Sequence, residues 1–145
     1  MNSVRPFKLD IPESEIDELR SRLTSARWPE SQTVEDWSQG VPLNYHREFC
    51  DYWANDYDWY RTQDRLNRYS QFKTQIEDLD IHFLHIRSSH DDAMPIIITH
   101  GWPGSIIEFH KILEPLAEPT RHGGSARDAF HVICPSLPGY GFSGK

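Results

Sequence analysis

The segment His100-Gly101-Trp102-Pro103-Gly104 combines residue types that can form an oxyanion-binding turn. It lies between the apolar run 96–99 and a helical pattern that begins at Ser105. Glycine lets a backbone turn sharply and approach a ligand, and Trp102-Pro103 is the one dipeptide of the turn that can hold a cis bond. We expect the Trp102 N–H to be exposed there, where it could stabilise negative charge developing on a substrate oxygen. The alternative is an ordinary strand-to-helix turn with no catalytic role.

A second glycine-rich segment, residues 139–145, fills the first seven positions of a phosphate-binding P-loop. Against this interpretation, the segment 135–138 separates the loop from its strand, two aromatic rings occupy it, and no Ser or Thr follows Lys145. Nucleotide binding therefore remains only the less favoured alternative. The same segment is not a nucleophile elbow either, because Lys145 stands where the closing glycine would be.

The other chemistry-bearing residues predict neither a metal site nor a cofactor. His82 and His85 are three residues apart on an expected strand, so their side chains leave opposite faces. The chain has 15 Lys and Arg against 22 Asp and Glu, and its net charge of −7 at pH 7 disfavours nucleic acid as a partner. Cys50 and Cys134, without a secretory leader, favour a reducing compartment, and we expect the cytoplasm. We also expect no membrane span, because no apolar run approaches the roughly 20 residues required.

The first half of the chain has the pattern of short amphipathic helices. We expect one helix from Pro12, with Ser14 and Asp17 as a capping box, to near Trp28-Pro29. A second is expected from about Pro42 to Asn55, and a third from near Asp58. The second helix should turn Leu43, Phe49, Cys50 and Trp53 toward the core. Four of the five tryptophans lie in this half, more than three short helices can bury, so we expect it to dock onto something larger.

The second half has the pattern of an α/β sheet. Residues 72–76 and 80–86 indicate two strands joined by the turn 77–79, and we expect the two strands to pair as a hairpin. The apolar runs 96–99 and 130–134 are typical of parallel strands covered on both faces, and residues 105–116 between them have helical spacing. Together they predict a βαβ unit within a parallel sheet that is incomplete at the carboxyl end.

Taken in order, several blocks of the sequence resemble the amino-terminal part of epoxide hydrolases of the microsomal type. The resemblance covers nearly the whole chain, and its most specific part is the His-Gly-Trp-Pro segment. The helical half is similar to that family's amino-terminal extension. The matching blocks are 27–29, 57–59, 66–67, 71–74, 80–83, 100–105 and 135–143.

This resemblance implies an ether-bond hydrolase that converts epoxides and water into vicinal diols through a covalent ester, as in detoxification. Trp102 matches the family's first oxyanion-hole position, with its N–H as the donor. Its neighbours in the turn, His100, Gly101, Pro103 and Gly104, match positions that shape it. Gly139, Tyr140 and Gly141 match the loop that borders the substrate pocket.

The resemblance further implies that the nucleophile, the lid tyrosines, the acid and the base belong to stretches after Lys145. We therefore expect the 145 residues to be inert alone, either as part of a longer enzyme or as a truncated gene product. The expected domains are a helical extension, 1–71, and the opening strands and crossover helix of an α/β-hydrolase domain, 72–145. The competing hypothesis is a non-catalytic module that docks on a larger hydrolase. Assembly into a homo-oligomer is left open.

Overall fold

The computed structural model describes residues 3–145, which divide into two compact units. The sheet unit comprises residues 3–9 and 64–145, and the helical unit comprises Asp10–Gln63. In the sequence, the helical unit thus separates the short first segment of the sheet unit from its long second segment. The domain boundary expected after residue 71 stays a prediction.

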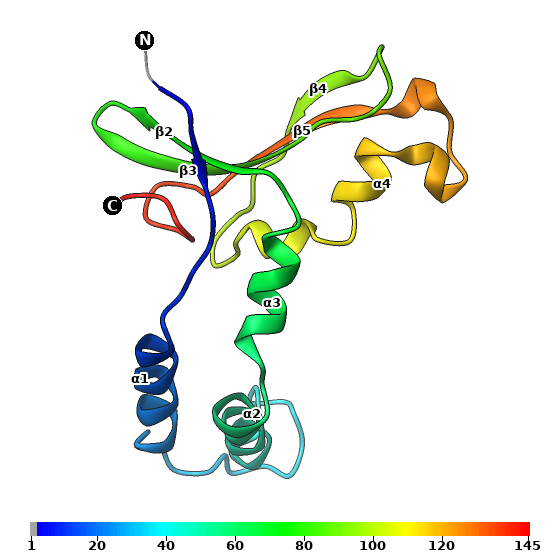
Figure 1. Ribbon diagram of the computed structural model, residues 1–145. Coiled ribbons are helices and arrows are strands. Elements are labelled where there is room, and N and C mark those ends of the chain that lie inside the picture. Colours follow the sequence, from blue (N-terminus) through cyan, green and yellow to red (C-terminus); the bar gives the residue numbers. More distant parts are fainter. Residues whose placement is uncertain (1–2) are drawn as a thin grey trace. The chain divides into compact units, whose positions relative to one another are not determined.

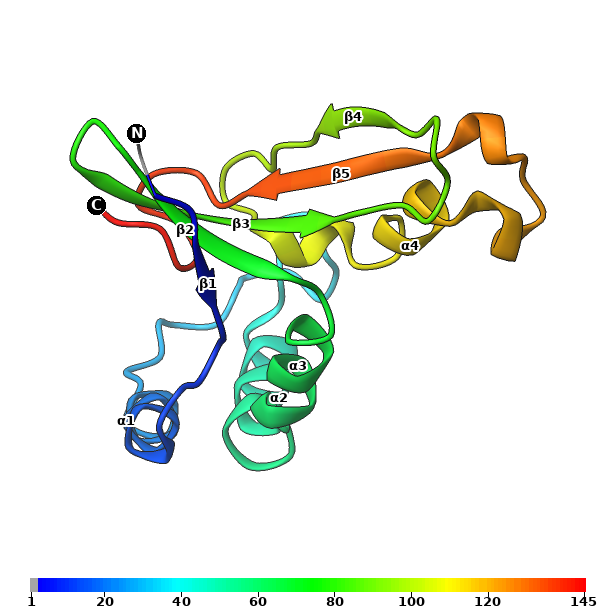
Figure 2. The same cartoon turned by 45° about the horizontal axis from the view of Figure 1, so that its top comes forward.

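The sheet unit is built on five strands, β1 to β5, in the spatial order β1-β2-β3-β5-β4 (Figures 1 and 2). The pairs β1–β2, β2–β3 and β3–β5 are antiparallel, whereas β4 and β5 are parallel with Ile96 opposite Val132. The expected hairpin and parallel pair are therefore confirmed. Bounds are Arg5–Phe7 (β1), Gln71–Ile76 (β2), Leu79–Ile86 (β3), Met94–Ile97 (β4) and Phe130–Pro135 (β5).

The β2–β3 hairpin turns at Glu77 and Asp78, whose φ angles are +46° and +67°. Two consecutive residues with positive φ form the type of two-residue turn whose twist matches that of the flanking strands. Asp tolerates this conformation because its short polar side chain can bond locally. The acidic turn expected from the sequence therefore lies at the expected place.

The connection between β4 and β5 is not the single helix expected over residues 105–116. It contains a 3₁₀ turn, Ile106–Phe109, and then the short helix α4, Leu113–Ala117, followed by two further 3₁₀ turns. Pro115 explains the break, because it lacks an N–H and its ring would collide with the carbonyl one turn earlier in a continuous helix. Ile106, Leu113 and Ala117 still bury their side chains, and α4 packs against β5.

The core of the sheet unit includes Leu9, Leu84, Val132 and Cys134, all fully or almost fully buried. Strand β4 lies at the edge of the sheet, and its Ile97 side chain is 66% exposed. The expectation that this strand is covered on both faces is therefore wrong for residues 3–145. Both cysteines are free thiols.

The helical unit contains α1, Glu13–Thr24, and α2, Leu43–Asn55, and it also begins α3, Trp59–Leu66. The expected capping box of α1 is wrong, because the helix starts one residue after Pro12 and no side chain caps it. Helix α1 also ends at Thr24, four residues before the end expected near Trp28-Pro29. The Ala26 N–H bonds the Leu23 carbonyl at 3.3 Å, a tighter turn that ends the α-helical pattern.

Helix α2 has the expected bounds, but not the expected packing. Phe49 is 53% exposed and Trp53 is 39% exposed, whereas Leu43 and Cys50 are half-buried. Phe49 and Trp53 thus remain on the surface among the described residues. Their exposure fits the expectation that this half of the chain has more aromatic surface than it can bury by itself.

Candidate active site

The oxyanion candidate lies in the turn that follows β4. The ladder continues one residue past β4, where the Ile98 N–H bonds the Ile133 carbonyl at 3.0 Å, and the chain then leaves the sheet. The turn closes by a 2.7 Å hydrogen bond from the Gly104 N–H to the Gly101 carbonyl. The Trp102–Pro103 peptide bond is cis, and the Trp102 residue is 84% exposed. The turn therefore projects from the carboxyl end of a parallel strand, where open α/β sheets bind ligands.

The Trp102 N–H is a free donor in this arrangement. Within residues 3–145, no oxygen or nitrogen accepts a hydrogen bond from it, and it belongs to no strand or helix. An unpaired main-chain donor that is held by a closed turn can stabilise an oxyanion without reorganising during the reaction. The oxyanion-hole role expected of Trp102 remains a prediction.

His100 is buried and connects the turn to the loop after β5. Its Nε2 atom lies 3.2 Å from the Leu137 N–H, and its Nδ1 atom lies 3.2 Å from the Gly101 carbonyl oxygen. Because an amide N–H can only donate, Nε2 must be the acceptor. The proton of the neutral ring is therefore on Nδ1 and is donated to Gly101. His100 thus holds together the loops that follow two adjacent parallel strands.

The two glycines of the turn, Gly101 and Gly104, have different surroundings. A Cβ atom at Gly104 would collide with the Glu108 carboxylate, whereas a Cβ at Gly101 would meet nothing within 4 Å. The Glu108 carboxylate is the far end of a flexible side chain and can move aside, so space does not strictly require glycine at either position. The roles expected of Gly101, Pro103 and Gly104 in shaping the turn remain predictions.

The loop after β5 carries the predicted pocket-border residues Gly139, Tyr140 and Gly141. The Tyr140 ring packs edge-on against the His100 ring, with centroids 5.4 Å apart. Both glycines have positive φ, +79° at Gly139 and +52° at Gly141, and a Cβ at Gly141 would lie 2.8 Å from Ser136 Oγ. The structure thus brings Tyr140 beside His100, and the loop needs glycine at position 141.

The same loop does not have the geometry of a P-loop. The N–H groups of Gly139, Tyr140, Ser143 and Gly144 donate to main-chain carbonyls at 2.7 to 3.1 Å. A phosphate-binding loop instead directs several free N–H groups at its ligand. Nucleotide binding is therefore disfavoured by geometry as well as by sequence.

A buried polar cluster beside this loop was not identified as functional from the sequence. His82 on β3 places Nδ1 2.9 Å from Ser136 Oγ and Nε2 3.0 Å from Gln71 Oε1. Burial, with a smaller contribution from the Lys73 charge, lowers the pKa of His82 to about 4. No signal in the sequence indicates these bonds, because Ser136 is 54 residues away from His82.

Other reactive groups of the sheet unit are inactive or unclustered. Burial raises the pKa of the Cys134 thiol to about 12, which excludes a thiolate at neutral pH. Among residues 3–145, no group of three or more His, Cys, Asp or Glu is arranged to hold a metal ion. In the same range, no helix is both long and apolar enough to cross a bilayer.

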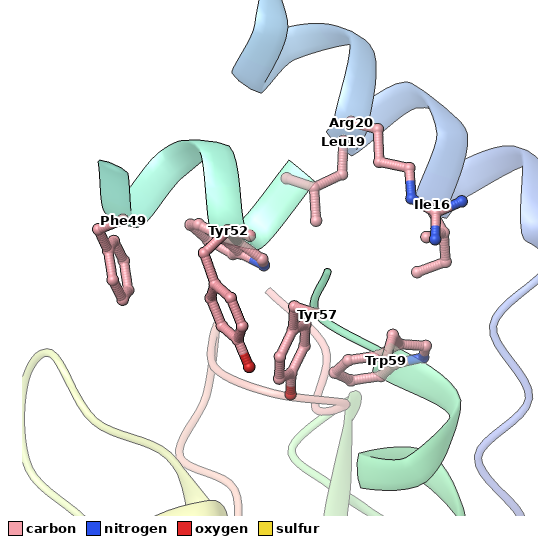
Figure 3. A pocket seen from close by; sticks show the side chains of 8 residues that line it. Ile16, Leu19, Arg20, Phe49, Tyr52, Tyr57 and Trp59 are labelled. Atoms are coloured by element: carbon pink, nitrogen blue, oxygen red, sulfur yellow. The ribbon is translucent and has the colours of Figure 1, made fainter. Parts of the chain in front are cut away.

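The helical unit contains a separate feature, an apolar groove of about 400 Å³. Side chains from α1, from α2 and from the start of α3 face a common space there (Figure 3). We call it the aromatic groove; it is lined by Ile16, Leu19, Arg20, Phe49, Tyr52, Trp53, Tyr57 and Trp59. Its volume lies within the range of known binding cavities.

Comparison with known proteins gives two family matches. Residues 4–109 match the family described as epoxide hydrolase N terminus, and residues 94–145 match the alpha/beta hydrolase fold. A Stigmatella aurantiaca protein assigned as an epoxide hydrolase is 56% identical over 98% of this chain. Epoxide hydrolase 1 of Sus scrofa is 42% identical over 97% of it.

Solved structures give the same result. The Aspergillus niger epoxide hydrolase superposes on 99% of this chain with a TM-score of 0.84 and 34% identity. In each comparison the relative is much longer: this chain spans 32% of the two curated relatives and 37% of the Aspergillus niger chain. The matched region is their amino-terminal part.

Proposed function

Because the chain belongs to the epoxide hydrolase family, we propose that it supplies the oxyanion-binding turn of an enzyme that converts epoxides and water into vicinal diols. The family resemblance found in the sequence is thereby confirmed, as is the α/β-hydrolase fold. The chain spans about a third of the length of its curated relatives, so the activity of the whole protein is part of the proposal.

The proposed reaction has two steps, and both conserve atoms and charge. In the first, a carboxylate oxygen attacks one epoxide carbon, the C–O bond of the ring breaks, and the released oxygen takes a proton from an acid. In the second, a histidine removes a proton from water, and the resulting hydroxide adds to the ester carbonyl. The tetrahedral intermediate then collapses: the ester C–O bond breaks, and the departing diol oxygen takes the proton from the histidine. The carboxyl proton returns to the acid of the first step, which restores the carboxylate. We place the carboxylate, the acid and the histidine in the polypeptide that the relatives have beyond the matched third.

The Trp102 N–H acts in the second step. Addition of hydroxide makes the ester carbonyl oxygen an oxyanion, and a fixed N–H donor stabilises that state more than the uncharged ester. The observation that supports this role is that the donor is free and lies after the carboxyl end of β4, in a residue that is largely exposed. His100 supports it further, because its ring bonds both the turn and the Leu137 N–H.

The test compares Trp102→Pro with Trp102→Phe in the whole enzyme. Proline deletes the N–H, whereas phenylalanine keeps it and removes only the indole ring. Loss of one oxyanion donor costs about 2.7–4 kcal/mol in other enzymes, or about a hundredfold to a thousandfold in rate. We expect Trp102→Pro to slow ester hydrolysis by that factor and ester formation much less. Trp102→Phe should leave the ratio of the two rates nearly unchanged.

Single-turnover kinetics separates the two steps. Equal slowing of ester formation and ester hydrolysis by Trp102→Pro would contradict the assigned role. Because two consecutive prolines can distort the turn, the melting temperature of both variants serves as the control for misfolding.

A second candidate function rests on the aromatic groove. We propose that the helical unit docks a hydrolase polypeptide there, because aromatic side chains remain exposed along α2. The test is co-purification with an epoxide hydrolase polypeptide that lacks its own amino-terminal third. Trp53→Ser should abolish it. Tyr45→Ser should not, since Tyr45 is an exposed aromatic residue of the same helix outside the groove. Equal co-purification of both variants with the hydrolase polypeptide would reject the groove as the docking site.

A further inference from the structure

The buried polar cluster around His82 is a continuous chain of hydrogen bonds. Gln71 Nε2 donates to the Leu66 carbonyl and to Asn67 Oδ1, both at 3.1 Å, so Gln71 Oε1 is the atom that faces His82. This oxygen accepts from His82 Nε2–H at 3.0 Å. His82 Nδ1 is then an acceptor, and the Ser136 hydroxyl must donate to it at 2.9 Å. One tautomer of His82 satisfies every group.

The cluster also fastens the backbone of the loop after β5 onto β3. The Ser136 N–H donates to the His82 carbonyl at 2.9 Å, and the His82 N–H donates to Ser143 Oγ at 2.9 Å. The Ser143 hydroxyl in turn donates to the Ser136 carbonyl at 2.7 Å. Ser136 is thus held by its side chain and by both of its main-chain polar groups. It is also completely buried, which makes each of these bonds costly to leave unmade.

The next residue in the chain transmits this constraint to the oxyanion turn. The Leu137 N–H, one peptide away from Ser136, donates to His100 Nε2. His100 Nδ1–H then donates to the Gly101 carbonyl, which also accepts the Gly104 N–H and closes the turn around Trp102. A continuous path of bonded groups therefore runs from the sheet core to the turn that carries the proposed donor.

We propose that His82 and Ser136 are positioning residues that set the direction of the Trp102 N–H through Leu137 and His100. This inference rests on the proposed function, because it assumes that the Trp102 N–H serves ester hydrolysis. Neither residue touches the reacting atoms. They act by fixing the loop 136–144, to which His100 is bonded. Small displacements of a catalytic donor are costly, since a shift of about 1 Å can reduce a rate by about a hundredfold.

The experiment measures both chemical steps by single-turnover kinetics in the whole enzyme. Ser136→Ala removes the hydroxyl that donates to His82 and adds no bulk. We expect it to slow ester hydrolysis about tenfold and to leave ester formation within about twofold of wild type. The matched control is His85→Gln, because His85 lies on the same strand but bonds no member of the cluster through its ring. It should leave both rates unchanged.

A purely structural role would give a different result. It would lower the melting temperature and the fraction of active enzyme without changing the ratio of the two rates. If Ser136→Ala does not fold, Ser143→Ala provides the test instead. It removes the hydroxyl that accepts from the His82 N–H and donates to the Ser136 carbonyl. A ratio within about twofold of wild type in the folded variant would overturn the inference. Failure of the wild-type enzyme to open epoxides would instead overturn the proposed function.

Discussion

Substituting Gly141 tests how closely the loop after β5 is fitted to the buried cluster. In Gly141→Ala, the new Cβ would lie 2.8 Å from Ser136 Oγ at a φ of +52°. A left-handed conformation costs a non-glycine residue about 1–2 kcal/mol. Pushing the Ser136 hydroxyl off His82 would leave a buried acceptor unpaired, at a cost of about 1–3 kcal/mol. We therefore expect Gly141→Ala to lower the free energy of unfolding by about 2–5 kcal/mol.

Gly139→Ala is the matched control for this prediction. Gly139 also has a positive φ, +79°, but its Cβ would meet only Lys145 Cβ, at 3.9 Å. Only the conformational cost of about 1–2 kcal/mol should then apply. Equilibrium unfolding in urea measures both values. With a typical slope of about 2 kcal/mol per M, the midpoints of the two variants should differ by about 1 M. Equal midpoints would show that the loop does not press on Ser136 and would refute the reasoning.

Two further predictions concern buried titratable groups. The pKa of His82 is about 4 in the folded protein and 6.5 ordinarily, so the unfolded chain binds the extra proton first as pH falls. Stability should therefore fall between about pH 6.5 and pH 4, by up to about 3 kcal/mol. Urea unfolding of the wild type and of His82→Asn at several pH values measures this loss of stability. If the free energy of unfolding depends on pH equally in both proteins, the loss does not come from His82. Cys134, with its raised pKa, should resist alkylation at pH 8 until the protein unfolds, whereas early labelling found by mass spectrometry would contradict its burial.

Local patterns were sufficient to predict much of this fold. The hairpin turn at residues 77–78 follows from turn chemistry, and the bounds of α2 follow from periodicity within a short window. The parallel pairing of β4 and β5 joins distant residues, and it follows from the strand-helix-strand order that is typical of a βαβ unit. The exposed turn around Trp102 also follows from its glycines and its place after an apolar run. Apart from the β4–β5 pairing, these features are local, and local sequence determines them.

The features that were missed depend on contacts between distant residues. Strand β1 is only three residues long and forms because it pairs with β2, more than 60 residues away, with Pro6 opposite Phe72. The link between His100 and Leu137 and the link between His82 and Ser136 likewise join separate loops. The break in the expected helix is the exception, because Pro115 is a local signal against a continuous helix.

The helical unit is inserted after β1 at a single point of the sheet unit. Asn67 bonds both main-chain groups of Leu9, accepting from its N–H at 2.9 Å and donating to its carbonyl at 2.8 Å. The points where the chain departs from the sheet and returns to it are thus clamped together by one amide. A segment with adjoining ends can be gained, exchanged or lost without rethreading the strands around it. Residues 10–63 therefore form an insertion that the sheet unit accommodates at one junction.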